Sequence, residues 1–268
     1  MIEMRFIMFT FNSTRDMGSM SGKSKFYKNK TKEEIKKDLL ERRKKLGDYF
    51  GFDGTKIIVP YQNLDKHKEG HYENVTEMVS DILIDDPNCD LWNLDIPCDI
   101  MIIENSLKGV MMAYPVADCP VVMATNGDVI AFAHCGAKEI DRFLPYKVID
   151  ALRSVKDIDI SDINVLVGPS ASKESYIYET YPKWAKNPVW DMCIEEVDNG
   201  YSIDLKKAIK LELTYAGLKD CYIDSRDTIT NDLFYSNYAA FHGKEDKSGR
   251  FLVGAGFKNK EKILRKSR

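Results

Sequence analysis

The sequence is poor in the patterns that mark several specialised classes of protein. Six cysteines among 268 residues are too sparse for a disulfide scaffold, and no Cys-x-x-Cys pair is present to build a four-cysteine zinc ribbon. The most apolar run, residues 109–124, is broken by two prolines and an aspartate, whereas a membrane-spanning helix needs ~20 mostly apolar residues. No tandem repeat or low-complexity tract occurs. The sequence therefore predicts neither a domain stabilised by disulfides or a four-cysteine zinc site, nor a transmembrane protein, nor a repeat protein.

An excess of charge of one sign is also missing, because 39 Lys and Arg residues nearly offset 42 Asp and Glu residues. The resulting pI, near 5.9, argues against a dedicated nucleic-acid binder, whose domain pI usually exceeds ~9. The first ten residues include Glu3 and Arg5 and lack the apolar core of a signal peptide. We therefore expect a cytoplasmic protein with free thiols and with no nucleic-acid or membrane partner.

The composition that remains, with 44% hydrophobic and 30% charged residues, is that of a globular protein. Periodicity predicts helices over residues 31–46, 72–85, 145–155 and 202–216, the first opened by a Thr31–Glu34 capping box and stopped by Gly47 or Gly51. Short apolar runs predict strands over residues 3–12, 56–59, 100–103, 109–114, 121–125, 128–135, 164–167, 220–223 and 251–254. Residues 86–97, which include two prolines and two asparagines, are predicted to form an irregular segment. We expect one α+β domain over residues 1–257, with mixed, largely antiparallel sheets flanked by helices, and a basic tail over residues 258–268.

One turn carries a prediction about chemistry. The Asn-Gly dipeptide at 126–127, between two apolar runs, is typical of a two-residue hairpin turn. Such a turn pairs Thr125 with Asp128, and the same register places Cys119 directly opposite His134. Opposed side chains on one face of a sheet have their Cβ atoms ~4.5–5.5 Å apart. A thiol and an imidazole would then face each other at the end of the hairpin.

Such a pair can do two kinds of chemistry. The imidazole can favour a thiolate nucleophile, or both groups can bind a metal ion such as zinc. The alternative without function is a buried cysteine beside a hydrogen-bonded histidine. Pro120 favours irregular pairing next to Cys119, and a bulge there would separate the pair.

At these residues the sequence resembles a known family. Residues 116–122 (VADCPVV) and 133–136 (AHCG) are similar to the two signature strands of the laccase-domain family, also called the multicopper polyphenol oxidase family. Its members are now regarded as purine nucleoside phosphorylases. Further similarities follow in the family's order at residues 13–15 (STR), 60–62 (PYQ), 98–100 (CDI), 168–169 (GP), 202–205 (SIDL) and 249–250 (GR). The chain resembles a divergent member of that family.

The resemblance implies an enzyme that splits inosine, adenosine or guanosine with phosphate into the base and ribose 1-phosphate, with adenosine deamination as a second reaction. It also implies zinc held by a His, a Cys and a second His. Cys119 and His134 match two of these positions, and as catalytic residues they would organise the pocket. The third position falls on Leu64, which cannot bind a metal, although His67 and His71 follow closely and are candidates to replace it. The four histidines of the chain are too few for a multicopper cluster.

The resemblance also points to contacts for the phosphate. Arg15, Lys138 and Arg250 are the candidate anion-binding residues. Lys138 stands where the family has an arginine, which keeps the charge and loses bidentate geometry. An arginine pair of the family is absent at residues 236–239. These departures leave two alternatives open: a Cys-His hydrolase or deamidase without metal, and a catalytically degenerate nucleoside-binding protein.

Overall fold

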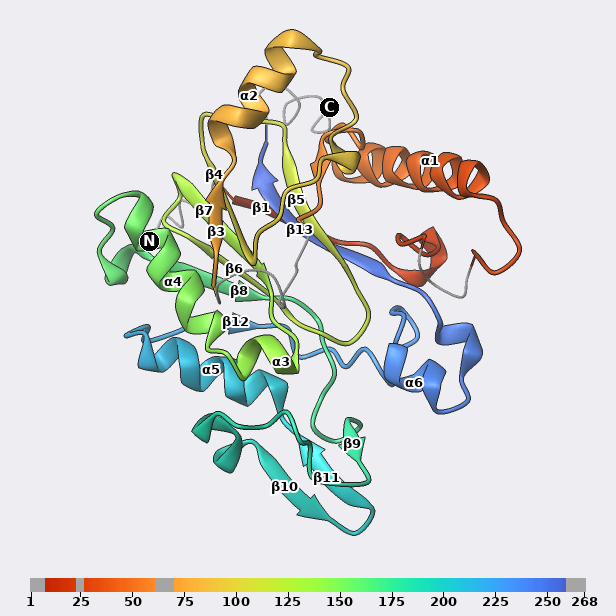
Figure 1. Cartoon of the computed structure of the whole chain (residues 1–268), viewed down its shortest axis with the longest axis vertical. Coiled ribbons are helices and arrows are strands. Elements are labelled where there is room, and N and C mark those ends of the chain that lie inside the picture. Colours follow the sequence, from red (N-terminus) through yellow and green to blue (C-terminus); the bar gives the residue numbers. More distant parts are fainter. Residues whose placement is uncertain (1–7, 23–26, 61–69, 259–268) are drawn as a thin grey trace, which may run out of the picture.

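The computed structural model describes residues 8–22, 27–60 and 70–258, and in it two β-sheets pack face to face between layers of helices (Figure 1). The larger sheet has the order β12-β8-β6-β7-β4-β3 and the smaller one the order β1-β13-β5-β2. Three of the ladders are parallel, namely β12–β8, β2–β5 and β3–β4, and the other ladders between described strands are antiparallel. The predicted α+β fold with mixed, largely antiparallel sheets is therefore confirmed.

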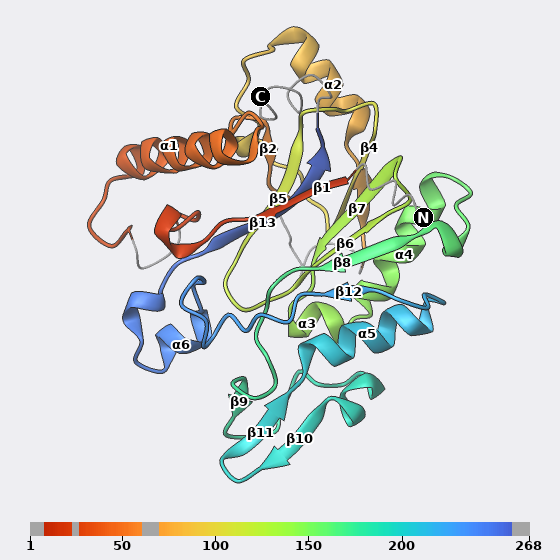
Figure 2. The ribbon, with the colours of Figure 1, turned by 180° about the vertical axis from the view of Figure 1, so that it is seen from behind.

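The strands of the larger sheet are β3 (Tyr72–Asn74), β4 (Ile100–Glu104), β6 (Val121–Thr125), β7 (Val129–His134), β8 (Asn164–Val167) and β12 (Tyr222–Ile223). Those of the smaller sheet are β1 (Met8–Asn12), β2 (Ile57–Ile58), β5 (Met111–Val116) and β13 (Phe251–Phe257). A third sheet, of β9 (Ile177–Tyr178), β10 (Ile194–Val197) and β11 (Gly200–Ile203), lies beyond the two large ones (Figure 2). The helices are α1 (Lys32–Phe50), α2 (Thr76–Asp85), α3 (Ala137–Ile140), α4 (Leu144–Val155), α5 (Leu205–Tyr215) and α6 (Asn237–Phe241).

Alternation along the strands explains the layers. In β4, Ile100 and Ile102 pack with α4 and α5, whereas Met101 and Ile103 pack against the smaller sheet. Successive strand residues point to opposite faces, so a strand that is apolar throughout belongs between two layers. The outer face of the smaller sheet is in turn covered by α1, through Leu46. No helix among the described residues is long and apolar enough to span a bilayer.

The start and the end predicted for the first helix are confirmed in α1. Thr31 and Glu34 form the predicted capping box, and the helix ends at Gly51, which adopts the left-handed conformation that glycine tolerates. Gly47, the other candidate for the end of the helix, lies inside α1. Residues 86–97 form a largely irregular segment that contacts α1 through a partly buried ion pair, with Arg43 Nη1 2.7 Å from Asp90 Oδ1.

Two predictions about elements are wrong. Residues 72–74 form β3 rather than the start of a helix, because they pair with β4, and α2 begins only at Thr76. The hairpin turn between β6 and β7 has four residues rather than two, since Thr125 pairs with Ile130. Side chains cause this longer loop: Asn126 Oδ1 accepts hydrogen bonds from the backbone of Asp128 and Val129, at 3.1 and 3.0 Å.

Candidate active site

The Cys119–His134 pair lies at the end of the β6–β7 hairpin. His134 is opposite Val121 in the last ladder pair, and the Pro120 carbonyl then accepts a hydrogen bond from Cys135 N at 2.9 Å. The predicted direct opposition of Cys119 and His134 is therefore wrong by two residues. A shift of two keeps side chains on the same face of a sheet, so the pair lies on a diagonal.

A glycine leaves open the space between the two side chains. By continuation of the register, Cys119 is opposite Gly136. A Cβ atom on Gly136 would lie 2.9 Å from Cys119 Sγ, 3.4 Å from His134 Cε1 and 2.8 Å from Glu139 Oε2. Three chemically active side chains therefore converge on the gap beside Gly136, and the third, Glu139, is one that the sequence analysis missed.

We expect Gly136→Ala to close this gap. The φ of Gly136 is −70°, which suits alanine, so the cost arises only from crowding against Cys119 and Glu139. Overpacking of this kind costs about 1–2 kcal/mol. Urea unfolding measures the loss, and an unchanged free energy of unfolding would mean that both side chains can swing outward freely.

Glu139 is brought to the pair by α3, which begins directly after β7. Its side chain is 9% exposed, and Oε1 lies 3.9 Å from His134 Nδ1. This distance is too long for a hydrogen bond, and no described residue donates one to the carboxylate. No sequence motif marks Glu139, because only the turn of α3 places it over the hairpin.

Burial dominates the protonation of the pair. It raises the pKa of Cys119 to about 12, the nearby Glu139 and Asp118 carboxylates add to the rise, and Arg250 opposes it. Burial lowers the pKa of His134, which Glu139 opposes. A neutral thiol next to a neutral imidazole is the opposite of the activated thiolate that a metal-free Cys-His enzyme needs.

Arg250 is the predicted anion contact that the structure brings to the pair. Its positive charge is close enough to lower the pKa of both Cys119 and His134. Its guanidinium donates to Gly249 O at 2.7 Å and to Asn237 Oδ1 at 3.4 Å, and among the described residues it has no carboxylate partner. Arg250 therefore places a guanidinium near the pair that no described carboxylate holds in an ion pair, although the Glu139 and Asp118 carboxylates also lie near the thiol.

The other two predicted anion contacts have different surroundings. Arg15 forms an ion pair with Asp246 at 3.0 Å and lies against the ring of Tyr235. Lys138 is exposed on α3. The structure gives neither of them a contact with Cys119 or His134.

Of the two histidines named as possible third ligands, only His71 lies among the described residues. His71 directly precedes β3, and its Nε2 lies 2.7 Å from Glu73 Oε1. Leu64 and His67 lie outside the described residues. Within the described part of the chain, no three His, Cys, Asp or Glu side chains stand as an assembled metal cluster.

The donor set around Gly136 nevertheless suits zinc in its chemistry. Zinc takes thiolate sulfur, imidazole nitrogen and carboxylate oxygen, at ~2.0–2.3 Å. Cys119, His134 and Glu139 supply one of each around a common gap. Bound zinc would also remove the need for a free thiolate, since it deprotonates a coordinating thiol.

Two buried polar atoms near the pair have no partner among the described residues. Tyr114 stacks on Phe132 with its ring 5.8 Å from that of His134, and its hydroxyl makes no hydrogen bond. Asp99 accepts from Gly70 N at 3.1 Å through Oδ2, while its Oδ1 is unpaired. Buried polar groups are normally satisfied, so these atoms are available to a bound molecule or water.

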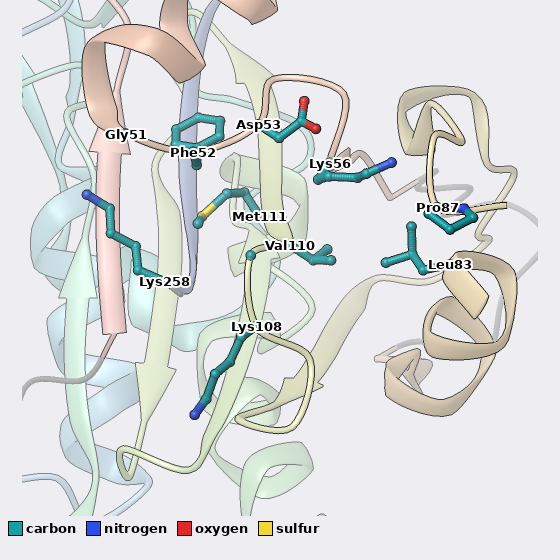
Figure 3. A pocket seen from close by; sticks show the side chains of 11 residues that line it. Gly51, Phe52, Asp53, Lys56, Leu83, Pro87, Lys108, Val110, Met111 and Lys258 are labelled. Carbon is teal, nitrogen blue, oxygen red and sulfur yellow. The ribbon is translucent and has the colours of Figure 1, made fainter. Parts of the chain in front are cut away.

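A separate pocket of about 270 Å³ lies at the other end of β5, near Met111 (Figure 3). Its lysines point in different directions, and Lys56 and Lys258 each donate to a backbone carbonyl at 2.6 Å. They do not converge on one point as an anion site would. The pair at the Val116 end of β5 is therefore the better candidate.

Comparisons with known proteins identify the family of the chain. Residues 11–258 match the family described as multi-copper polyphenol oxidoreductase laccase. A purine nucleoside phosphorylase of Rickettsia conorii is 26% identical over 154 residues, which are 54% of this chain and 62% of that protein, so the match spans about three-fifths of the relative.

Solved structures give the same fold. YlmD of Geobacillus stearothermophilus aligns with a TM-score of 0.66 at 20% identity, over 83% of this chain and 81% of that one. A DUF152 protein of Neisseria meningitidis aligns with a TM-score of 0.65 at 15% identity, over 94% and 90% of the two chains. At these identities the likeness concerns the fold alone.

Proposed function

Because the chain belongs to the multi-copper polyphenol oxidoreductase laccase family, we propose that it is a purine nucleoside phosphorylase acting at the Cys119–His134 pair. Its substrates are inosine, adenosine or guanosine together with phosphate. The observation that carries the proposal is Arg250, a guanidinium near the pair that has no ion-pair partner among the described residues and suits a phosphate. The name of the Rickettsia relative supports the same reaction.

The reaction needs an anion held against the sugar. A phosphate oxygen forms a bond to C1′, the bond from C1′ to the base nitrogen breaks, and its electron pair leaves with the base, which takes up a proton. Arg250 would hold the phosphate, because a guanidinium forms charge-assisted hydrogen bonds to phosphate oxygens. The Tyr114 hydroxyl and Asp99 Oδ1, which have no partner among the described residues, would bind polar atoms of the nucleoside.

Zinc is part of this proposal. Cys119 and His134 would hold it, and when bound it would act as a Lewis acid on a substrate or phosphate oxygen. The raised pKa of Cys119 favours this proposal over the metal-free hydrolase or deamidase, which would need an acidic thiol.

The test is product analysis after incubation with each of the three nucleosides, with and without phosphate. We expect base release that depends on phosphate and is lost in Cys119→Ala. Inosine formed from adenosine would reveal the deaminase reaction. A folded protein that yields no product from any nucleoside would favour the degenerate binding protein instead.

Arg250→Ala is expected to raise the KM for phosphate about 10- to 100-fold, because a charged hydrogen bond is worth about 1.5–3 kcal/mol. Arg250→Lys should recover part of the loss. Arg153→Ala, which removes an arginine from the remote end of α4, is the matched control and should leave the KM unchanged. Equal KM values in Arg250→Ala and the control would remove Arg250 from the phosphate site.

A further inference from the structure

A mostly buried carboxylate, that of Glu139, lies beside the Cys119–His134 pair, in a chain whose sequence lacks the third metal ligand. Leu64 occupies the third position of the His-Cys-His set that the family resemblance implies. The side chain of Glu139 is nine-tenths buried, accepts no hydrogen bond from a described residue, and reaches the gap beside Gly136. A carboxylate in such surroundings is costly unless a positive charge compensates it.

We propose that Glu139 is the third protein ligand of a divalent cation of the zinc class, together with Cys119 and His134. This inference rests on the proposed function, of whose site it specifies the ligand set. A thiolate and a carboxylate would balance the two charges of the ion, and the neutral imidazole would complete three protein ligands. Three protein ligands with one open position is the arrangement typical of catalytic zinc.

The geometry favours Glu139 over the described alternative, His71. Glu139 Oε2 and Cys119 Sγ both lie within 2.9 Å of the same point, the position of a Cβ on Gly136. His71 is 40% exposed and is held by Glu73 at 2.7 Å. Recruiting its imidazole would break that contact, whereas Glu139 breaks no hydrogen bond among the described residues by turning to a cation.

Metal analysis tests the ligand set without reference to activity. The full-length protein is loaded with zinc, dialysed, and analysed for zinc per chain, and cobalt(II) is added to the metal-free form to detect thiolate–cobalt absorption. We expect one zinc per wild-type chain, and at least about tenfold weaker binding in Glu139→Gln. Glu139→Asp, which keeps the charge on a shorter side chain, should be intermediate.

Variants of the alternative ligands complete the design. His67→Asn, His71→Asn and the exposed-site control Glu179→Gln should keep the wild-type affinity, and thermal unfolding of each metal-free variant verifies its fold. Wild-type zinc affinity in Glu139→Gln, or loss of zinc in His67→Asn or His71→Asn, would overturn the proposal. A wild-type chain that binds no zinc would overturn it as well. Phosphate-dependent base release, measured separately, shows whether the proposed function survives such a result.

Discussion

Asp118→Ala is expected to destabilise the protein by about 3–5 kcal/mol, because several hydrogen-bond donors would lose the one carboxylate that they share. The Asp118 carboxylate is buried and accepts hydrogen bonds from Thr228 Oγ1 at 3.0 Å and from Tyr238 N at 2.7 Å. Ser236 and the Asn237 backbone also donate to it. Alanine would leave these buried donors unpaired, and each such group costs about 1–3 kcal/mol.

The network also explains why the residue matters for the site. Asp118 immediately precedes Cys119, and its carbonyl accepts a hydrogen bond from Ala171 N at 2.9 Å. Its carboxylate joins the loop of Cys119 to two segments that are distant in sequence, at Thr228 and at the start of α6. Loss of the carboxylate should release Cys119 from its place beside Gly136.

Urea unfolding at neutral pH measures the effect. Asp157→Ala removes an exposed aspartate and should change the free energy of unfolding by less than ~0.5 kcal/mol. Asp118→Asn should be intermediate, because its amide nitrogen must face a donor. If Asp118→Ala lost no more than the control, the four donors would have to find other partners, and the loop would not depend on this carboxylate.

The layers of the fold could be predicted because local patterns and tertiary packing agree. Strands that are apolar on both faces, such as β4 and β7, have to lie between two layers, and the capping box at Thr31 fixes the start of α1. Residues 72–74 were misassigned because pairing with β4 overrides a helical pattern of only a few residues. Local pattern alone does not contain that partner.

The site was predictable in part for a similar reason. The face shared by Cys119 and His134 follows from the parity of the strand, which survives a register shift of two. The shift itself depends on the Asn126 side chain capturing the loop, and turn statistics do not decide that. Glu139 could not be predicted, since its position depends on how α3 turns back over the end of β7.

A second carboxylate, on α5, is expected to make stability depend on pH. Glu212 is 2% exposed, and burial raises its pKa from 4.5 to about 8. Its Oε1 accepts from Asn187 Nδ2 at 3.3 Å, while its Oε2 has no partner among the described residues. Lys147 lowers this pKa and Asp141 raises it, so the nearby charges partly cancel.

The direction in which the free energy of unfolding changes with pH follows from the number of protons that the folded and unfolded states bind. Below pH 4.5 the carboxyl group is protonated in both states and carries no penalty. Between pH 4.5 and about 8 the unfolded chain loses the proton while the folded protein keeps it, so the free energy of unfolding falls as pH rises. At about 1.4 kcal/mol per pH unit, the upper limit of the loss is about 5 kcal/mol, reached above pH 8.

Glu212→Gln should therefore stabilise the protein increasingly with pH. Glutamine resembles the protonated acid, so the two proteins should be nearly equal in stability at pH 5 and differ by several kcal/mol at pH 9. Urea unfolding at pH 5, 7 and 9 measures the difference, with Glu179→Gln as an exposed control that should follow the wild type. A constant difference between Glu212→Gln and wild type across this range would mean that Glu212 is already ionised in the folded protein at pH 5.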